Sequence, residues 1–193
     1  MFDSSVDWPG RLAGSVTSVR PWLRDVTLVV FGAALVAGLS QVVIPLGFTP
    51  VPLSLGNLAV LLVGGALGAR RGVAALLLWA VAGWLGAPVL AGFGRGLGGP
   101  TFGYIVGYIV AALLIGWLAG RDGRSSVGRN VLTMVLGVVV IYLFGLPYLA
   151  LVTHASLATV LLQGLAPFVL GDLLKSLVAA GLLSFKGSRQ ARF

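Results

Sequence analysis

The sequence predicts an all-α integral membrane protein, a single membrane domain with six transmembrane helices and both termini in the cytoplasm. Of its 193 residues, 58% are hydrophobic and only 9% are charged, and the mean hydropathy is +1.04. This composition is too apolar for a soluble domain of this length. The apolar runs are about 20 residues long, which is the length of a helix that crosses the bilayer. The positive charges are confined to alternate loops, as in multi-pass proteins.

Proline, glycine and arginine separate the predicted helices. A proline-rich stretch, Thr49–Pro52, follows the first helix, and Arg70-Arg71-Gly72 predicts a tight turn between the second and the third. A glycine-rich loop, Gly92–Gly99, joins the third and the fourth helices. The stretch Tyr148–Gly164 fits a loop, a re-entrant helix or the continuation of a tilted helix. The predicted spans are Val26–Leu46, Pro52–Ala69, Val73–Ala91, Pro100–Ala119, Val131–Pro147 and Leu165–Phe185.

The distribution of charge predicts the orientation. All but two of the 13 Lys and Arg residues lie before the first span, after the sixth, or in the loops that follow the second and fourth spans. Loops rich in Lys and Arg stay in the cytoplasm. Residues 1–25 are therefore expected to form a cytoplasmic segment, 26–185 the six-helix core and 186–193 a basic cytoplasmic tail. The net charge of +8 needs no nucleic-acid partner. The two exceptions are Arg95, in an external loop, and Lys175, inside the sixth span.

Two opposite charges inside the sixth span mark the candidate binding site. Asp172 and Lys175 are three residues apart and share one helix face, which Phe168 continues. A charged side chain near the bilayer centre costs about 2.5–3.5 kcal/mol on insertion scales, so such residues are usually functional. At 1.5 Å per residue, Asp172 lies about 10 Å below the outer surface. The pair is either a structural ion pair or the polar floor of a ligand pocket. The energetic cost of placing two charges inside the membrane favours the ligand pocket.

Three further polar residues are predicted in the outer half of the membrane or above it. Arg95 belongs to the string Gly94-Arg95-Gly96-Leu97-Gly98-Gly99, which matches G-x-G-x-x-G, but no βαβ unit surrounds it and a dinucleotide site is excluded. Arg95 is either a solvated loop residue or a cation that closes over a ligand. Gln41 and Asn57 are amides at the depth of Asp172 and serve either packing or ligand binding.

The aromatic residues near the outer surface and the small residues on the first span each have two possible roles. Tyr104 and Trp84 lie near the outer ends of their spans, where aromatic residues anchor helices to the interface or, alternatively, line a binding site. On the first span, Ala33 and Ala37 form one smooth stripe and Ala34 and Gly38 another, either for packing or for docking on a partner's helices. Close helix packing explains the stripe of small residues on the fourth span: Gly99, Gly103, Gly107 and Ala111.

This set of groups suits a small ligand with both polar and apolar parts. Asp172 would accept hydrogen bonds from ligand N–H groups. Lys175 would keep Asp172 ionised, donate to a ligand carbonyl or meet an anion. Arg95 would close over a ligand carboxylate, which a guanidinium binds through two parallel hydrogen bonds. Such an arrangement predicts tight and selective binding rather than a wide pore.

Four motifs, in order and at family spacing, give the sequence a specific resemblance. Together they make the chain similar, from about Phe31 to Ala180, to the BioY family of biotin-specific substrate-binding (S) subunits of energy-coupling factor (ECF) transporters. The motifs are Thr49-Pro50-Val51-Pro52-Leu53-Ser54-Leu55, Gly86-Ala87-Pro88-Val89, Gly99-Pro100-Thr101-Phe102-Gly103-Tyr104 and Pro167-Phe168-Val169-Leu170-Gly171-Asp172-Leu173-Leu174-Lys175.

The resemblance implies a six-helix protein of the bacterial plasma (inner) membrane that captures biotin at its outer face. It implies a transmembrane coupling subunit and two ATPase subunits as partners, so that ATP and Mg²⁺ are used by those partners and this chain carries no cofactor. It also implies that Asp172 and Lys175 belong to the biotin site and that Ala33 and Ala37 form the docking face. Asn57 stands next to the position of a family glutamine, and Phe102 replaces a common glycine that would leave the mouth of the site wider.

Three other functions remain as alternatives at this point. The first is an S subunit or stand-alone carrier for a different vitamin. The second is a membrane-embedded enzyme, and the third is a purely structural subunit. An enzyme needs a nucleophile with its base or a set of metal ligands. The chain has no cysteine and a single histidine, so we expect neither catalytic residues nor a metal site.

Overall fold

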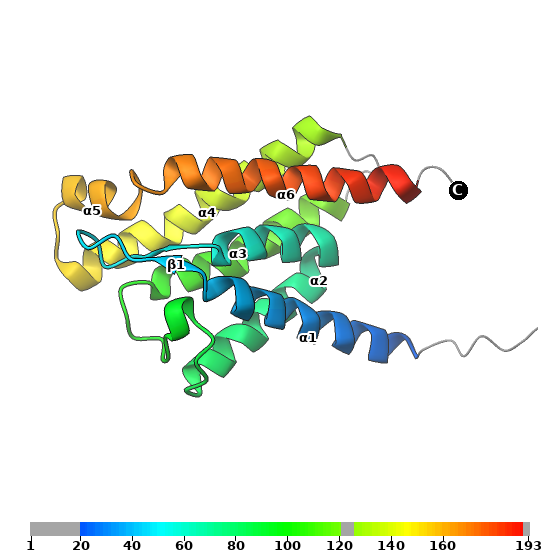
Figure 1. The fold of residues 1–193 in the computed structure, drawn as a ribbon, viewed down its shortest axis with the longest axis horizontal. Coiled ribbons are helices and arrows are strands. Elements are labelled where there is room, and N and C mark those ends of the chain that lie inside the picture. The colour runs from blue at the N-terminus through cyan, green and yellow to red at the C-terminus, as the bar shows by residue number, and fades with distance from the viewer. Residues whose placement is uncertain (1–19, 121–125, 191–193) are drawn as a thin grey trace, which may run out of the picture.

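The fold is given by a computed structural model, which describes the backbone of residues 20–120 and 126–190 and the side chains of 20–119 and 126–185. Arg11, Arg121, Arg124 and Arg192, part of the orientation argument, lie outside the described residues, as does most of the predicted N-terminal segment. Within the described part the chain forms six α-helices (Figure 1). The first residue of α1 and the last residues of α6 lie at the same end of the bundle (Figure 1).

The first helix, α1 (Pro21–Ser40), begins with proline, which fits the first turn of a helix because its missing N–H is not needed there. The prediction extended this helix to Leu46, which is wrong. The chain instead forms a short antiparallel hairpin of β1 (Val43–Ile44) and β2 (Leu53–Ser54). Pro45 prevents the helix from continuing to Leu46, because a proline disfavours helical geometry in the residue before it.

The second helix, α2 (Gly56–Trp84), is broken at Gly68, whose φ of 78° and ψ of 175° are not helical. A methyl group built on Gly72 would lie 3.3 Å from the Cα of Gly64. In a continuous helix these two residues would be about 12 Å apart, so the chain reverses direction at Gly68. The predicted turn at Arg70–Gly72 is therefore misplaced by a few residues, because Gly68 is the residue that adopts the positive φ. Arg71 pairs with Asp25 of α1, 2.6 Å away.

The remaining helices are longer or later than predicted. After η1 (Ala91–Phe93) and α3 (Phe102–Gly120), α4 (Val127–Thr153) continues through Pro147, so most of the ambiguous stretch belongs to helices. The residue that follows its last turn, His154, caps the helix and has a left-handed backbone with φ of 53°. Then α5 (Leu157–Gly164) precedes α6 (Val169–Gln190), and the two are bent by 45° at their junction.

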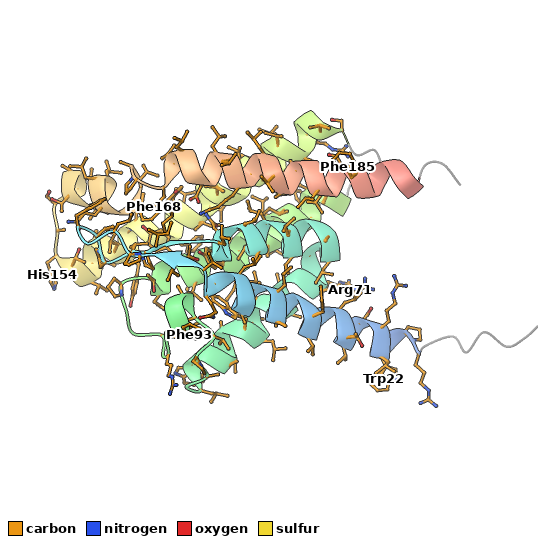
Figure 2. The ribbon with its side chains drawn as sticks, in the orientation of Figure 1. Trp22, Arg71, Phe93, His154, Phe168 and Phe185 are labelled. Carbon is orange, nitrogen blue, oxygen red and sulfur yellow. The ribbon has the colours of Figure 1, made fainter. Side chains whose placement is uncertain are left out.

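The helices have the length and surface of a multi-pass membrane protein. By length and composition alone, α1, α2, α3 and α4 of the described residues each qualify as membrane-crossing helices, and α5 with α6 adds a fifth if the bent pair is one span. Large apolar side chains are exposed on the outside, as on Leu170 and Phe185. Figure 2 shows Arg71 and Phe185 toward one end of the bundle and His154 at the other.

Close packing of α3 on α4 depends on the predicted glycine stripe. A methyl group built on Gly107 would lie 2.9 Å from the Cα of Ile141, and one on Gly103 would overlap Tyr148. Glycine at these positions lets the two backbones approach. This packing holds Ile141 and Tyr142 of α4 against the cavity described below.

Candidate ligand-binding site

A cavity between α2, α3, α4 and α6, completed by the β1–β2 hairpin, brings most of the predicted site residues together. Asp172, Lys175, Asn57, Tyr104 and Phe168 all line it. The other lining residues are Ser40, Val51, Pro52, Ser54, Trp79, Leu90, Ala91, Thr101, Ile105, Tyr108, Ile141 and Tyr142. Figure 2 shows Phe168, which lines this cavity, toward the end of the bundle away from Arg71 and Phe185.

The carboxylate of Asp172 is buried and held from two helices. Its side chain is only 6% exposed, and its Oδ1 accepts a hydrogen bond of 3.0 Å from the ammonium of Lys175, one turn further along α6. Its Oδ2 accepts a hydrogen bond of 2.5 Å from the hydroxyl of Tyr142 on α4. Lys175 also donates to the carbonyl oxygen of Ser54, at 2.8 Å. A buried charge is tolerated when it is paired and hydrogen-bonded in this way.

Asn57 is buried without a partner for its carbonyl oxygen. The residue is 7% exposed at the start of α2, and its Oδ1 makes no hydrogen bond within the described part of the chain. A buried polar atom without a partner costs about 1–3 kcal/mol. The amide lines the same cavity as Asp172 and Lys175. Its position therefore suits a hydrogen bond with a bound ligand.

Aromatic rings form the apolar walls of the cavity. Trp79 stacks on Tyr108, with ring centroids 6.1 Å apart and an interplanar angle of 29°. Tyr104 meets Tyr142 edge to face at 6.5 Å and donates its hydroxyl to the carbonyl of Gly164 at 2.9 Å. Such walls favour a flat or compact apolar group between them.

A second, outer cavity adjoins the first one and contains Arg95. It is lined by the glycine-rich loop, with Arg95 and Phe102 among its residues. The two cavities share five lining residues, so they are neighbouring parts of one path. The shared residues are Pro52, Leu90, Ala91, Thr101 and Ile105. We call this second cavity the mouth; Arg95 lines it and does not line the cavity that contains Asp172. Phe102 also lies at the mouth, where its ring packs edge to face on Tyr148.

Gln41 does not line either cavity in the structure. Its amide nitrogen donates to the carbonyl of Ala37 at 2.6 Å and to that of Val89 at 3.3 Å, and its oxygen accepts from the N–H of Phe93 at 2.7 Å. Every polar atom of the side chain is thus engaged with the backbone of α1 and of the loop that follows α2. Gln41 holds this loop against α1.

Trp84 also lies outside both cavities. It is the last residue of α2 and is 65% exposed. Trp79, five residues earlier, points into the cavity, and its indole N–H donates to the carbonyl of Val89 at 2.7 Å. Five residues turn a helix by about 500°, so the two rings face different directions.

The predicted docking residues on α1 are not equally accessible. Ala33 is buried at 8% exposure and packs in the cluster that joins α1 to α2, whereas Ala37 is partly buried beside it. The neighbouring stripe of small residues, Ala34 and Gly38, is exposed. The surface of α1 that a partner could contact is therefore formed by the second stripe rather than by Ala33.

Sequence reasoning missed three aromatic residues of the site: Trp79, Tyr108 and Tyr142. A tyrosine in the middle of an apolar helix carries a hydroxyl that needs a partner, and this signal was available for Tyr142. The identity of the partner was not, because Tyr142 and Asp172 are 30 residues apart and meet through helix packing. Among the described residues no three His, Cys, Asp or Glu side chains are grouped so that they could hold a metal ion.

The fold and the cavity define a class, the multi-pass membrane proteins that bind a small molecule between their helices. Within that class, the chain belongs to the BioY family, whose family model matches residues 11–191.

Relatives and one solved structure agree with this membership. The biotin transporter BioY of Rhizobium etli is 38% identical over 169 residues, covering 81% of this chain and 89% of the relative. That of Rhodobacter capsulatus is 38% identical over 175 residues, covering 83% and 91%. The crystal structure of the S-component for biotin from an ECF-type ABC transporter matches with a TM-score of 0.74 at 25% identity, covering 84% of this chain and 90% of that one.

Proposed function

We propose that this protein captures biotin at the outer face of the bacterial plasma membrane and takes it into the cell as the S subunit of an ECF transporter. Its relatives are named biotin transporters, and its structural neighbour is an S-component for biotin. The observation on this chain that carries the proposal is the pattern of free hydrogen-bonding positions in the inner cavity.

That pattern matches a cyclic urea, which presents N–H, C=O and N–H in turn. An ammonium has three N–H donors, and Lys175 uses two of them, for Asp172 and Ser54. The third is left for a carbonyl. A carboxylate accepts up to about four hydrogen bonds, so Asp172 keeps positions for a ligand N–H. The unpartnered Oδ1 of Asn57 accepts the other N–H.

The remaining parts of biotin fit the rest of the path. The apolar thioether ring suits the aromatic walls that Trp79, Tyr108 and Tyr104 provide. The valerate chain would then extend through the shared wall of the two cavities toward the mouth. There the guanidinium of Arg95, which lines the second cavity, would bind the carboxylate. In this assignment Gln41 and Trp84 do not contact the ligand.

The proposal includes six spans and cytoplasmic termini. We count the two segments of α2 on either side of Gly68 as separate spans, and α5 with α6 as one broken span. Counted in this way the chain would cross the membrane six times, which agrees with the position of the start of α1 and the end of α6 at the same end of the bundle (Figure 1). Arg24 and Arg71 lie at this end, as the positive-inside rule requires of the cytoplasmic face. Residues 1–193 then form one membrane domain with its cavity in the outer half.

Transport would require partners that this chain does not supply. We infer a transmembrane coupling subunit and two ATPase subunits, which would use ATP and Mg²⁺, while this chain has no catalytic role. Ala34, Ala37 and Gly38 form the accessible part of the small-residue surface on α1 and would take the coupling subunit's helices.

Ligand-induced stabilisation of the purified protein tests the proposed function. Binding to the folded state raises stability by about 2.7 kcal/mol when the ligand is at 100 times its Kd. Biotin should raise the melting temperature, whereas riboflavin, thiamine and folate should not. A shift with another vitamin and none with biotin would favour the alternative, an S subunit or carrier for that vitamin. Uptake by cells with and without the ATPase subunits would then separate an S subunit from a stand-alone carrier.

A further inference from the structure

We propose that Tyr142 is a positioning residue that sets the selectivity of the site for ligand N–H groups by holding the carboxylate of Asp172. This inference rests on the proposed function, because it concerns how the same cavity recognises a cyclic urea. Tyr142 belongs to α4 and Asp172 to α6, so the contact also joins two helices that line the cavity.

Asp172 needs two contacts for its carboxylate to be fixed. The terminal torsion of an aspartate is broad and roughly two-fold, so one hydrogen bond to Lys175 leaves the plane of the carboxylate free to turn. The bond of 2.5 Å from the Tyr142 hydroxyl to Oδ2 and that of 3.0 Å from Lys175 to Oδ1 act on different oxygens. Together they define the plane and hence the direction of the remaining lone pairs.

Tyr142 is itself held in place by its contacts. Its ring packs edge to face on Tyr104, whose hydroxyl is bonded to the carbonyl of Gly164. The hydroxyl of Tyr142 donates its proton to Asp172 and so has no proton left for a ligand. As a hydrogen-bond donor, Tyr142 therefore acts on the ligand only through the carboxylate.

The consequence is a specific loss of selectivity. Without the hydroxyl of Tyr142, the carboxylate would still be present but would no longer be aimed at the ligand N–H. Binding would weaken, and the weakening would depend on whether the ligand has an N–H facing Asp172. A purely structural role for Tyr142 would weaken the binding of all ligands alike.

The test compares Tyr142→Phe with Tyr148→Phe, which removes a hydroxyl from the same helix at a position that lines neither cavity. Dissociation constants are measured for biotin and for its two N-methyl derivatives, each of which is methylated at a different ureido nitrogen. For Tyr142→Phe the Kd for biotin should rise by about 10- to 100-fold, as for a lost hydrogen bond to a charged group. Tyr148→Phe should change it by less than about twofold, within the range of neutral substitutions.

The decisive readout is the penalty for methylation. In the wild type, one derivative should bind much more weakly than biotin because it lacks the N–H that faces Asp172. In Tyr142→Phe this penalty should shrink about tenfold or more. An equal loss for all three ligands, or an unchanged Kd for biotin, would overturn the role of Tyr142. Failure of the wild type to bind biotin would instead contradict the proposed function.

Discussion

The strongest energetic prediction concerns the ion pair inside α6. Replacing Lys175 by Met removes the ammonium from an Asp172 side chain that is only 6% exposed. Breaking a buried pair by removing one partner costs about 3–5 kcal/mol, because the other charge stays buried without compensation. Lys175→Met should therefore lower the free energy of unfolding by about this amount. Because the hydrogen bond from the hydroxyl of Tyr142 remains, the expected loss of unfolding free energy lies toward the lower end of this range.

Removing both charges should reverse most of this loss. The double variant Asp172→Asn with Lys175→Met buries no charge, and its Asn oxygen still accepts from Tyr142. Replacing a buried pair by neutral groups is often neutral in stability or better. The double variant should thus be more stable than Lys175→Met alone and fail to bind biotin. A matched pair on the surface, Arg71 with Asp25, has side chains 38% and 49% exposed, so Arg71→Met should cost less than about 1 kcal/mol.

The assay is denaturant unfolding of the ligand-free protein in one detergent, followed by titration with biotin. The expected order of stability places Lys175→Met clearly below both the wild type and the double variant. If Lys175→Met cost no more than Arg71→Met, Asp172 would not depend on Lys175. If the double variant bound biotin like the wild type, the pair would be structural.

Three further predictions follow from other parts of the molecule. Arg95→Ala should weaken binding of biotin more than that of biotin amide, because the guanidinium at the mouth meets the carboxylate; equal losses for the two ligands would contradict this. Ala34→Leu should reduce uptake in cells while leaving the Kd for biotin unchanged, and normal uptake would exclude this stripe from docking. Gly107→Ala should lower stability by about 1–3 kcal/mol, because the added methyl group would lie 2.9 Å from the Cα of Ile141. Gly99→Ala, with no atom within 4 Å, is its control and should be nearly neutral in the same melting experiment.

Local sequence patterns were sufficient to group the residues in and just before α6 that line the cavity. Asp172, Lys175 and Phe168 share a face at helical spacing and all line the cavity. Charges in an apolar helix are rare enough to be recognised without knowledge of the neighbours. The same holds for Asn57, an amide at the corresponding depth.

Other residues could not be assigned because their roles depend on contacts between helices. The register of α4 on α6 brings Tyr142 to Asp172, and no local pattern encodes that register. Trp84 and Trp79 are equally aromatic, and the rotation of α2 about its axis decides which of them faces the cavity. The depth of Gln41 leaves both packing and ligand binding open, and the structure shows the backbone of a distant loop bonded to its amide.

Titration of biotin into purified wild-type protein and into Asp172→Ala tests the central claim most directly. In the variant the ligand N–H loses its acceptor and Lys175 is left without its counter-charge, so the Kd should rise by about 100-fold or more. Asp25→Ala, which removes a carboxylate at the opposite end of α1 from the hairpin, is the control and should bind like the wild type. Tight binding by the wild type and its loss in Asp172→Ala is the expected result. Wild-type affinity in Asp172→Ala would contradict the assignment of this cavity as the biotin site.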